Sequence, residues 1–111
     1  MRDNIGGGAL TETTLWILLA VYSPNHGYGI MQFIEKETEG RVVLGPGTLY
    51  GAINNLISKG WIEGWGEEKN TRKKDYVITA RGKEIVNTEI KRLGQVYHSA
   101  LKIAGEGGHS K

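Results

Sequence analysis

The chain has 111 residues, a net charge of +2 and no cysteine. This length fits one domain with a modest core, and the absence of thiols excludes disulfides, thiolate zinc sites and thiol catalysis. The longest apolar run, residues 15–22, is far shorter than the roughly 20 residues that cross a bilayer, and the N-terminus lacks the layout of a signal peptide. The sequence therefore predicts a soluble, cytoplasmic protein without a membrane partner.

Charge is unevenly distributed along the chain. Residues 1–40 carry two basic and five acidic side chains, residues 41–83 carry eight and four, and residues 84–111 carry four and three. The middle segment, with a net charge of +4, is the one suited to a polyanionic partner.

Residues 1–9 are glycine-rich and are expected to form a flexible arm. Thr11 can then cap a first helix that runs to about Tyr22. Because this helix is apolar nearly all round, we expect one side to pack in the core and the other to meet a second subunit. Ile17 and Val21 are predicted on that second side.

A turn at residues 23–25 precedes a second helix, expected from about His26 to Thr38 with Gly40 at its end. Gly45-Pro46-Gly47 is a break, and Pro46 suits the first turn of a third helix, which ends at Gly60. The apolar spacing predicts the buried residues of both helices. These are Ile30, Phe33 and Ile34 in the second helix, and Leu49, Ile53, Leu56 and Ile57 in the third.

Residues 61–65 and 75–79 are rich in aromatic and β-branched residues and predict two strands of a β-hairpin with a charged tip. Thr79 can cap a last helix over about 81–104. Its apolar residues alternate in steps of four and three, which is the seam of a short coiled coil. They are Val86, Ile90, Leu93, Tyr97, Ala100 and Ala104.

The predicted fold class is mainly α with a small β-hairpin. Three helices followed by a two-stranded wing are typical of a winged helix-turn-helix, which we assign to residues 10–80. Residues 81–104 form the expected dimerisation helix, and residues 105–111 a disordered tail.

The glycines at 45–51 do not form a nucleotide-binding loop. A P-loop would need a lysine that is missing here. The spacing G-x-G-x-x-x-G also differs from the dinucleotide fingerprint, and no βαβ unit surrounds it. The plain interpretation of these glycines is that they start a helix whose backbone must approach neighbouring groups closely. A helix start can still hold a nucleic-acid phosphate, because its first N–H groups are free.

Catalysis is not expected. The histidines His26, His98 and His109 lack metal-binding spacing, and no serine lies in a nucleophile-elbow motif. The sequence therefore predicts no enzyme activity, no metal and no cofactor.

A DNA interface is the remaining candidate. Asparagine can pair with adenine in the major groove, while threonine and tyrosine hydroxyls commonly meet phosphates. The exposed side of the third helix would carry Thr48, Tyr50, Gly51, Asn54, Asn55 and Ser58, with Lys59 at its end. A solvated polar face is the alternative. The hairpin tip favours DNA, since it carries Lys69, Arg72, Lys73 and Lys74, although Glu67, Glu68 and Asp75 flank them.

Three segments, "HGYGI" at 26–30, "GPGTLYGAINNLISKGWIE" at 45–63 and "RKKDYVITARGKE" at 72–84, resemble the PadR family of bacterial transcriptional regulators. The resemblance implies a homodimeric winged-helix repressor that binds an inverted-repeat operator in double-stranded DNA. The positions that it implicates in DNA contact are Tyr28, Thr48, Tyr50, Arg72, Lys73 and Lys74. The chain departs from the family at Gly51 and Asn54-Asn55, where members often have proline and then basic residues.

With one helix after the wing, the chain resembles the short subgroup of this family, which dimerises through the first and last helices. Some members bind flat aromatic compounds between the subunits. Thr14, Leu93 and Tyr97 are the residues expected near such a small hydrophobic effector. The sequence is equally compatible with a closed dimer core that has no pocket. The alternative function is a winged-helix module for protein–protein interaction without sequence-specific DNA binding.

Overall fold

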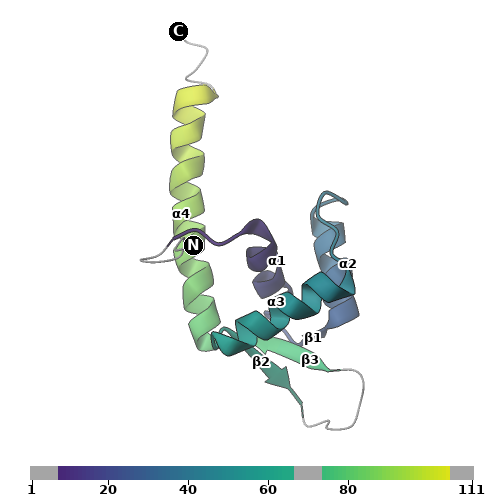
Figure 1. Cartoon of the computed structure of the whole chain (residues 1–111). Coiled ribbons are helices and arrows are strands. Elements are labelled where there is room, and N and C mark those ends of the chain that lie inside the picture. Colours follow the sequence, from purple (N-terminus) through teal and green to yellow (C-terminus); the bar gives the residue numbers. More distant parts are fainter. Residues whose placement is uncertain (1–7, 67–73, 106–111) are drawn as a thin grey trace. The chain divides into compact units, whose positions relative to one another are not determined.

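The computed structural model describes residues 8–66 and 74–105. The elements follow in the order α1 (Glu12–Ala20), β1 (Asn25–His26), α2 (Gly27–Glu37), α3 (Pro46–Ser58), β2 (Ile62–Trp65), β3 (Asp75–Ile78) and α4 (Ala80–Ala104) (Figure 1). The chain divides into two compact units: Thr11–Val86, and the described residues before and after it. The predicted mainly helical winged fold is confirmed, with one additional short strand.

Helix α1 begins as the sequence predicts, because the Thr11 hydroxyl accepts the Thr14 backbone N–H at 3.1 Å. The helix ends at Ala20, before the expected Tyr22. At this end the N–H of Val21 donates to the carbonyl of Leu18 three residues earlier, which tightens the last turn.

The expectation that Ile17, Val21 and Val86 meet a second subunit needs correction. All three belong to the unit Thr11–Val86 and have no exposed surface. A side chain without exposed surface offers no contact area to another chain, so we exclude them from the proposed dimer interface. They are core residues.

Helix α2 buries Ile30 and Ile34 as expected, while Phe33 is only half-buried. The Phe33 ring contacts the Trp16 ring of α1 edge-to-face, with ring centroids 6.3 Å apart. The chain reverses after Thr38 through two residues with positive φ, Glu39 and Gly40, and the Gly40 N–H donates to the Glu35 carbonyl at 2.8 Å.

Helix α3 has Pro46 in its first turn and buries Leu49, Ile53 and Leu56. Ile57 was expected in this set, but 40% of it is exposed, because it lies at the edge of the buried face. Gly60 ends the helix at φ +77, and the next N–H, that of Trp61, donates to the Leu56 carbonyl at 3.0 Å.

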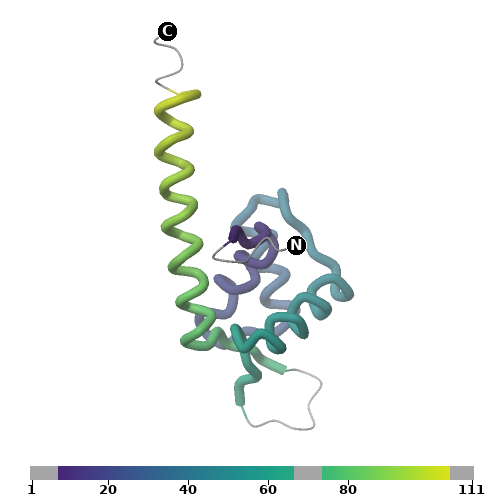
Figure 2. Tube along the Cα trace, turned by 60° about the vertical axis from the view of Figure 1, so that its left-hand side comes forward, coloured from purple at the N-terminus to yellow at the C-terminus, as the bar shows by residue number. Residues whose placement is uncertain are grey.

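The sheet is antiparallel with strand order β1-β3-β2. Ile62 pairs with Ile78 and Gly64 with Tyr76, and this face of the wing contributes Ile62, Tyr76 and Ile78 to the core. Within the unit Thr11–Val86, the three helices lie on one side of the sheet (Figures 1 and 2). Strand β1 was not predicted, since its two residues were expected in a turn and a helix start.

Helix α4 begins within the winged unit and is fixed there by Thr79. The Thr79 hydroxyl accepts the Gly82 N–H at 3.0 Å, as the sequence predicts, and donates to the Gly60 carbonyl at 2.7 Å. The Thr79 N–H donates to the Trp61 carbonyl at 2.9 Å. The end of α3 and the start of α4 are therefore joined by three hydrogen bonds through one residue.

Candidate nucleic-acid interface

Helix α3 presents an uncharged polar face. None of its 13 residues is Asp, Glu, Lys or Arg. The exposed side chains are those predicted from the sequence, namely Thr48, Tyr50, Asn54, Asn55 and Ser58, together with Pro46 and Ile57. Such a face can make hydrogen bonds to base edges and phosphates but supplies no Coulombic attraction of its own.

The predicted residues occupy different parts of this face. At 3.6 residues per turn, Thr48 and Tyr50 point about 160° apart and therefore mark its two edges. Asn54 and Ser58 lie between them. On the same side, a Cβ added at Gly47 or Gly51 would meet nothing within 4 Å. The centre of the face is thus built from small side chains, which lets a helix backbone approach a partner closely.

The other predicted contact residues lie outside α3. Tyr28 is 62% exposed in the first turn of α2, and Lys74 is exposed just before β3. The Lys59 ammonium lies 4.9 Å from the centroid of the Trp61 ring, a cation–π contact that fixes this charge at the end of α3. Arg72 and Lys73 lie outside the described residues.

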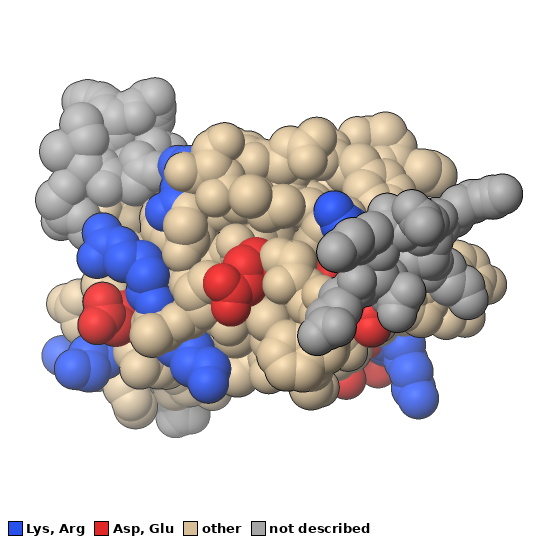
Figure 3. Space-filling model, turned by 90° about the horizontal axis from the view of Figure 1, so that it is seen from below, with Lys and Arg blue, Asp and Glu red and all other residues tan. Residues whose placement is uncertain are grey.

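Charges of both signs are mixed on this side of the molecule. Among the described residues visible from below, Lys and Arg stand singly and Asp and Glu lie between them (Figure 3). On the face seen from below, the described residues therefore form no continuous basic patch.

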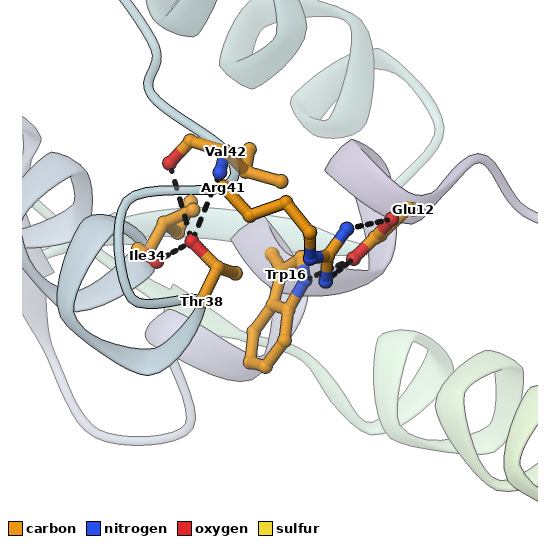
Figure 4. Close-up of polar contacts among 6 residues, drawn as sticks. All are labelled: Glu12, Trp16, Ile34, Thr38, Arg41 and Val42. Carbon is orange, nitrogen blue, oxygen red and sulfur yellow. Dashed lines mark hydrogen bonds and ion pairs between the residues drawn. The ribbon is translucent and has the colours of Figure 1, made fainter.

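The link between α2 and α3 is held by two polar anchors (Figure 4). The buried Thr38 hydroxyl donates to the Ile34 carbonyl at 2.8 Å and accepts the Val42 N–H at 3.0 Å. Arg41 donates to both carboxylate oxygens of Glu12, at 3.0 and 2.6 Å. The Trp16 indole N–H donates to the same carboxylate at 3.0 Å.

These contacts change the chemistry of Glu12. The hydrogen bond from Arg41, followed by that from Trp16, lowers the pKa of the Glu12 carboxyl from 4.5 to about 2. The Glu12 carboxylate therefore stays ionised well below pH 4.5, and its contact with Arg41 ties the start of α1 to the segment that leads into α3.

Beyond Val86, helix α4 exposes a wide apolar face. The predicted seam residues Ile90, Leu93, Tyr97 and Ala100 are all exposed. Val96, Leu101 and Ile103 are also exposed and were missed, because the strict seam pattern ignores positions that a 3.6-residue period places beside it. Thr14, the third predicted effector residue, belongs to the winged unit, where the Thr11 hydroxyl donates to its hydroxyl at 2.9 Å.

One charged pair borders this apolar face. Glu89 is buried and accepts two hydrogen bonds from Arg92, at 3.0 and 2.6 Å, and one from the Leu10 N–H at 3.4 Å. The Arg92 guanidinium lowers the pKa of the Glu89 carboxyl. This residue was not singled out from the sequence, where it looks like an ordinary helix glutamate.

Metal-binding clusters and membrane-spanning helices are both missing from the part of the chain that the structure describes. Within 8–66 and 74–105, no cluster of three or more His, Cys, Asp or Glu side chains could hold a metal ion. Over the same residues, no helix combines the length and hydropathy that crossing a membrane requires.

Comparison with known sequences points to one family. The transcriptional regulator PadR-like family matches residues 16–88. An uncharacterized 37.1 kDa protein in transposon Tn4556 of Streptomyces fradiae is 37% identical over 82 residues. These are 70% of this chain but 23% of that protein, so the chain spans about a quarter of its relative's length.

Several solved structures share the fold. A transcriptional regulator from Clostridium thermocellum has a TM-score of 0.68 at 22% identity, over 93% of this chain and 95% of that one. A PadR family regulator from Eggerthella lenta gives 0.66 at 18%, over 85% and 81%. Bacillus subtilis PadR in complex with operator DNA gives 0.58 at 22%, over 69% of this chain and 45% of that one.

Proposed function

Because the chain belongs to the PadR-like family of transcriptional regulators, we propose that it is a sequence-specific, DNA-binding repressor that acts as a cytoplasmic homodimer. The family consists of regulators and not of enzymes. The proposed target is an inverted-repeat operator, with α3 in the major groove and the wing on flanking DNA.

The observation that carries the proposal is the exposed face of α3, with Asn54 and Asn55 outward on a helix whose other face is core. Two such helices in a symmetric dimer would read half-sites about 34–36 Å apart, or a multiple of that spacing. Because α3 is uncharged, its contacts would be short-range, and attraction to the duplex would come from Lys59, Lys74 and the remaining wing cations.

The exposed apolar face of α4 supports the dimer. Ile90, Leu93, Tyr97 and Ala100 form the proposed interface, because large exposed apolar patches commonly mark association surfaces. We place a small hydrophobic or aromatic effector at Thr14, Leu93 and Tyr97 in the assembled dimer, where it would relieve repression by favouring one orientation of the two α3 helices.

A second function has specific support. The lack of charge on α3 and the exposed Trp65 and Ile57 would also suit a module that binds another protein. Gel shifts at two salt concentrations, using duplexes selected from a random pool, separate the two functions. Sequence selection supports the repressor, whereas failure to select any duplex at low salt rejects it.

Two variants then test the assignment of roles within the DNA interface. Replacing Lys73 and Lys74 with alanine should weaken binding to all sequences and flatten the salt dependence, by about 0.9 in logarithmic slope for each phosphate that is no longer neutralised. Asn54→Ala should relax base preference by about 1–3 kcal/mol at one position. Its salt slope should remain that of the wild type. If both variants behave alike, the groove assignment is wrong.

A further inference from the structure

Tyr50 lies at one edge of the exposed face of α3 and is 43% exposed. Its ring does not extend freely into solvent. A Cβ built at Gly27, the first residue of α2, would overlap the Tyr50 hydroxyl oxygen and lie 2.7 Å from its Cζ atom. The end of the phenol therefore rests directly on the backbone of α2, in a notch that exists only because residue 27 has no side chain.

The backbone does not explain this glycine. Among the described glycines, Gly40, Gly60 and Gly66 have positive φ, whereas Gly27 has no such conformation. A side chain at this buried position would occupy the space taken by the end of the Tyr50 ring.

A third element meets the same point. Gly27 directly follows β1, whose Asn25 pairs with Tyr76 of β3. Burial raises the pKa of the Tyr76 phenol, and the nearby Tyr50 phenol raises it further. The end of the Tyr50 ring therefore lies where α2, the sheet and α3 come together.

From this geometry we infer that Tyr50 is a positioning residue, whose ring locks α3 against the Gly27 notch of α2 and so sets the direction in which α3 presents Asn54. The inference rests on the proposed function, and it gives Tyr50 a role other than the DNA contact implied by the family resemblance. A tyrosine ring suits this role because it is rigid and has only two side-chain torsions.

The two roles differ in what the hydroxyl does. If Tyr50 positions α3 through its ring, Tyr50→Phe keeps the ring and should bind the selected duplex within about threefold of the wild type. If the hydroxyl instead bonds a phosphate, which is charged, the same change removes a hydrogen bond worth about 1.5–3 kcal/mol, or roughly 12- to 140-fold, on every duplex. A loss of more than about threefold on selected and random DNA alike would overturn the inference.

A double-mutant cycle between positions 27 and 50 tests the notch. Gly27→Ala should displace the ring and lower affinity for the selected duplex by about tenfold or more, which is 1.4 kcal/mol. Affinity for random duplexes should change little, so the ratio of specific to random affinity should fall. In a Tyr50→Leu background, where no ring end meets the new methyl, Gly27→Ala should cost nothing further. An equal cost in both backgrounds would overturn the inference.

Gly29→Ala is the matched control. It replaces a second glycine in the same turn, but its Cβ would overlap the Asn25 side-chain oxygen and not Tyr50. We expect Gly29→Ala to lower stability without changing the ratio of specific to random binding. Circular dichroism without DNA gives the folded fraction of each variant, and the binding constants are calculated for the folded protein. A wild type that selects no duplex overturns the proposed function itself. A wild type that selects one, with an unchanged ratio in Gly27→Ala, overturns only the role of Tyr50.

Discussion

At the scale of single residues, the contact between Glu12 and Arg41 shows how a surface pair can organise a turn. Glu12 opens α1, and Arg41 stands 29 residues later in the link to α3. Both side chains are partly exposed, so the pair is screened by solvent and its value lies in geometry. The bidentate contact, shared with Trp16, fixes one orientation of the link.

This contact predicts a specific dependence on pH. The pKa of Glu12 falls from 4.5 to about 2 in the folded protein. Its contribution to stability is therefore complete above pH 4.5 and is lost as the pH falls towards 2. We expect Glu12→Gln to lower the urea midpoint at pH 7 and to shrink the difference between midpoints at pH 7 and pH 3.

Glu84→Gln provides the control for this measurement. Its carboxylate lies 3.7 Å from Arg81, with both side chains exposed, so the wild-type pH difference should persist. If Glu12→Gln keeps the full pH difference as well, the contact with Arg41 does not form in solution.

At the scale of elements, the sequence predicts what local rules determine. Thr11, Thr79 and Gly60 mark helix ends through hydrogen bonds and backbone conformation that depend on nearby residues. Strand β1 was missed because its two residues acquire strand geometry only by pairing with β3, some 50 residues away. The role of Gly27 was missed for a similar reason, since its neighbour Tyr50 comes from another helix.

The candidate site shows the same division. The exposed face of α3 could be predicted from helical periodicity, apart from Ile57 at its boundary. The burial of Ile17, Val21 and Val86 could not, because an apolar residue in a sequence looks the same whether it fills the core or an interface. Which apolar face remains uncovered depends on the tertiary fold.

Two glycines of α4 give a prediction at this scale. A Cβ at Gly82 would overlap the Trp61 carbonyl oxygen and lie 2.7 Å from Ile78 Cγ1, whereas a Cβ at Gly94 would meet nothing within 4 Å. We expect Gly82→Ala to destabilise the protein by about 1–3 kcal/mol, because backbone cannot move aside cheaply. Gly94→Ala should be neutral or stabilising by up to about 1 kcal/mol. Urea unfolding measures both, and equal effects would contradict the tight start of α4.

At the scale of the whole molecule, the proposed repressor needs two reading helices and therefore two chains. Helix α4 carries an apolar surface that could join them, with Leu93 and Tyr97 exposed one turn apart. Burying such side chains against a second copy is worth about 25 cal/mol for each Å² of apolar area removed from water. A charge at the same positions would have to be desolvated in the interface, which opposes association.

The double variant Leu93→Glu with Tyr97→Glu should therefore dissociate the dimer. Light scattering should give the mass of two chains, twice 12.2 kDa, for the wild type and of one chain for the variant, with helix content by circular dichroism unchanged because both positions are exposed. Gln95→Glu is the matched control, since position 95 is about 160° from Leu93 around the helix, and it should remain dimeric. Operator binding should fall with dimer dissociation, because a single chain can occupy only one half-site. A double variant that keeps the mass of two chains would show that the interface lies on another surface.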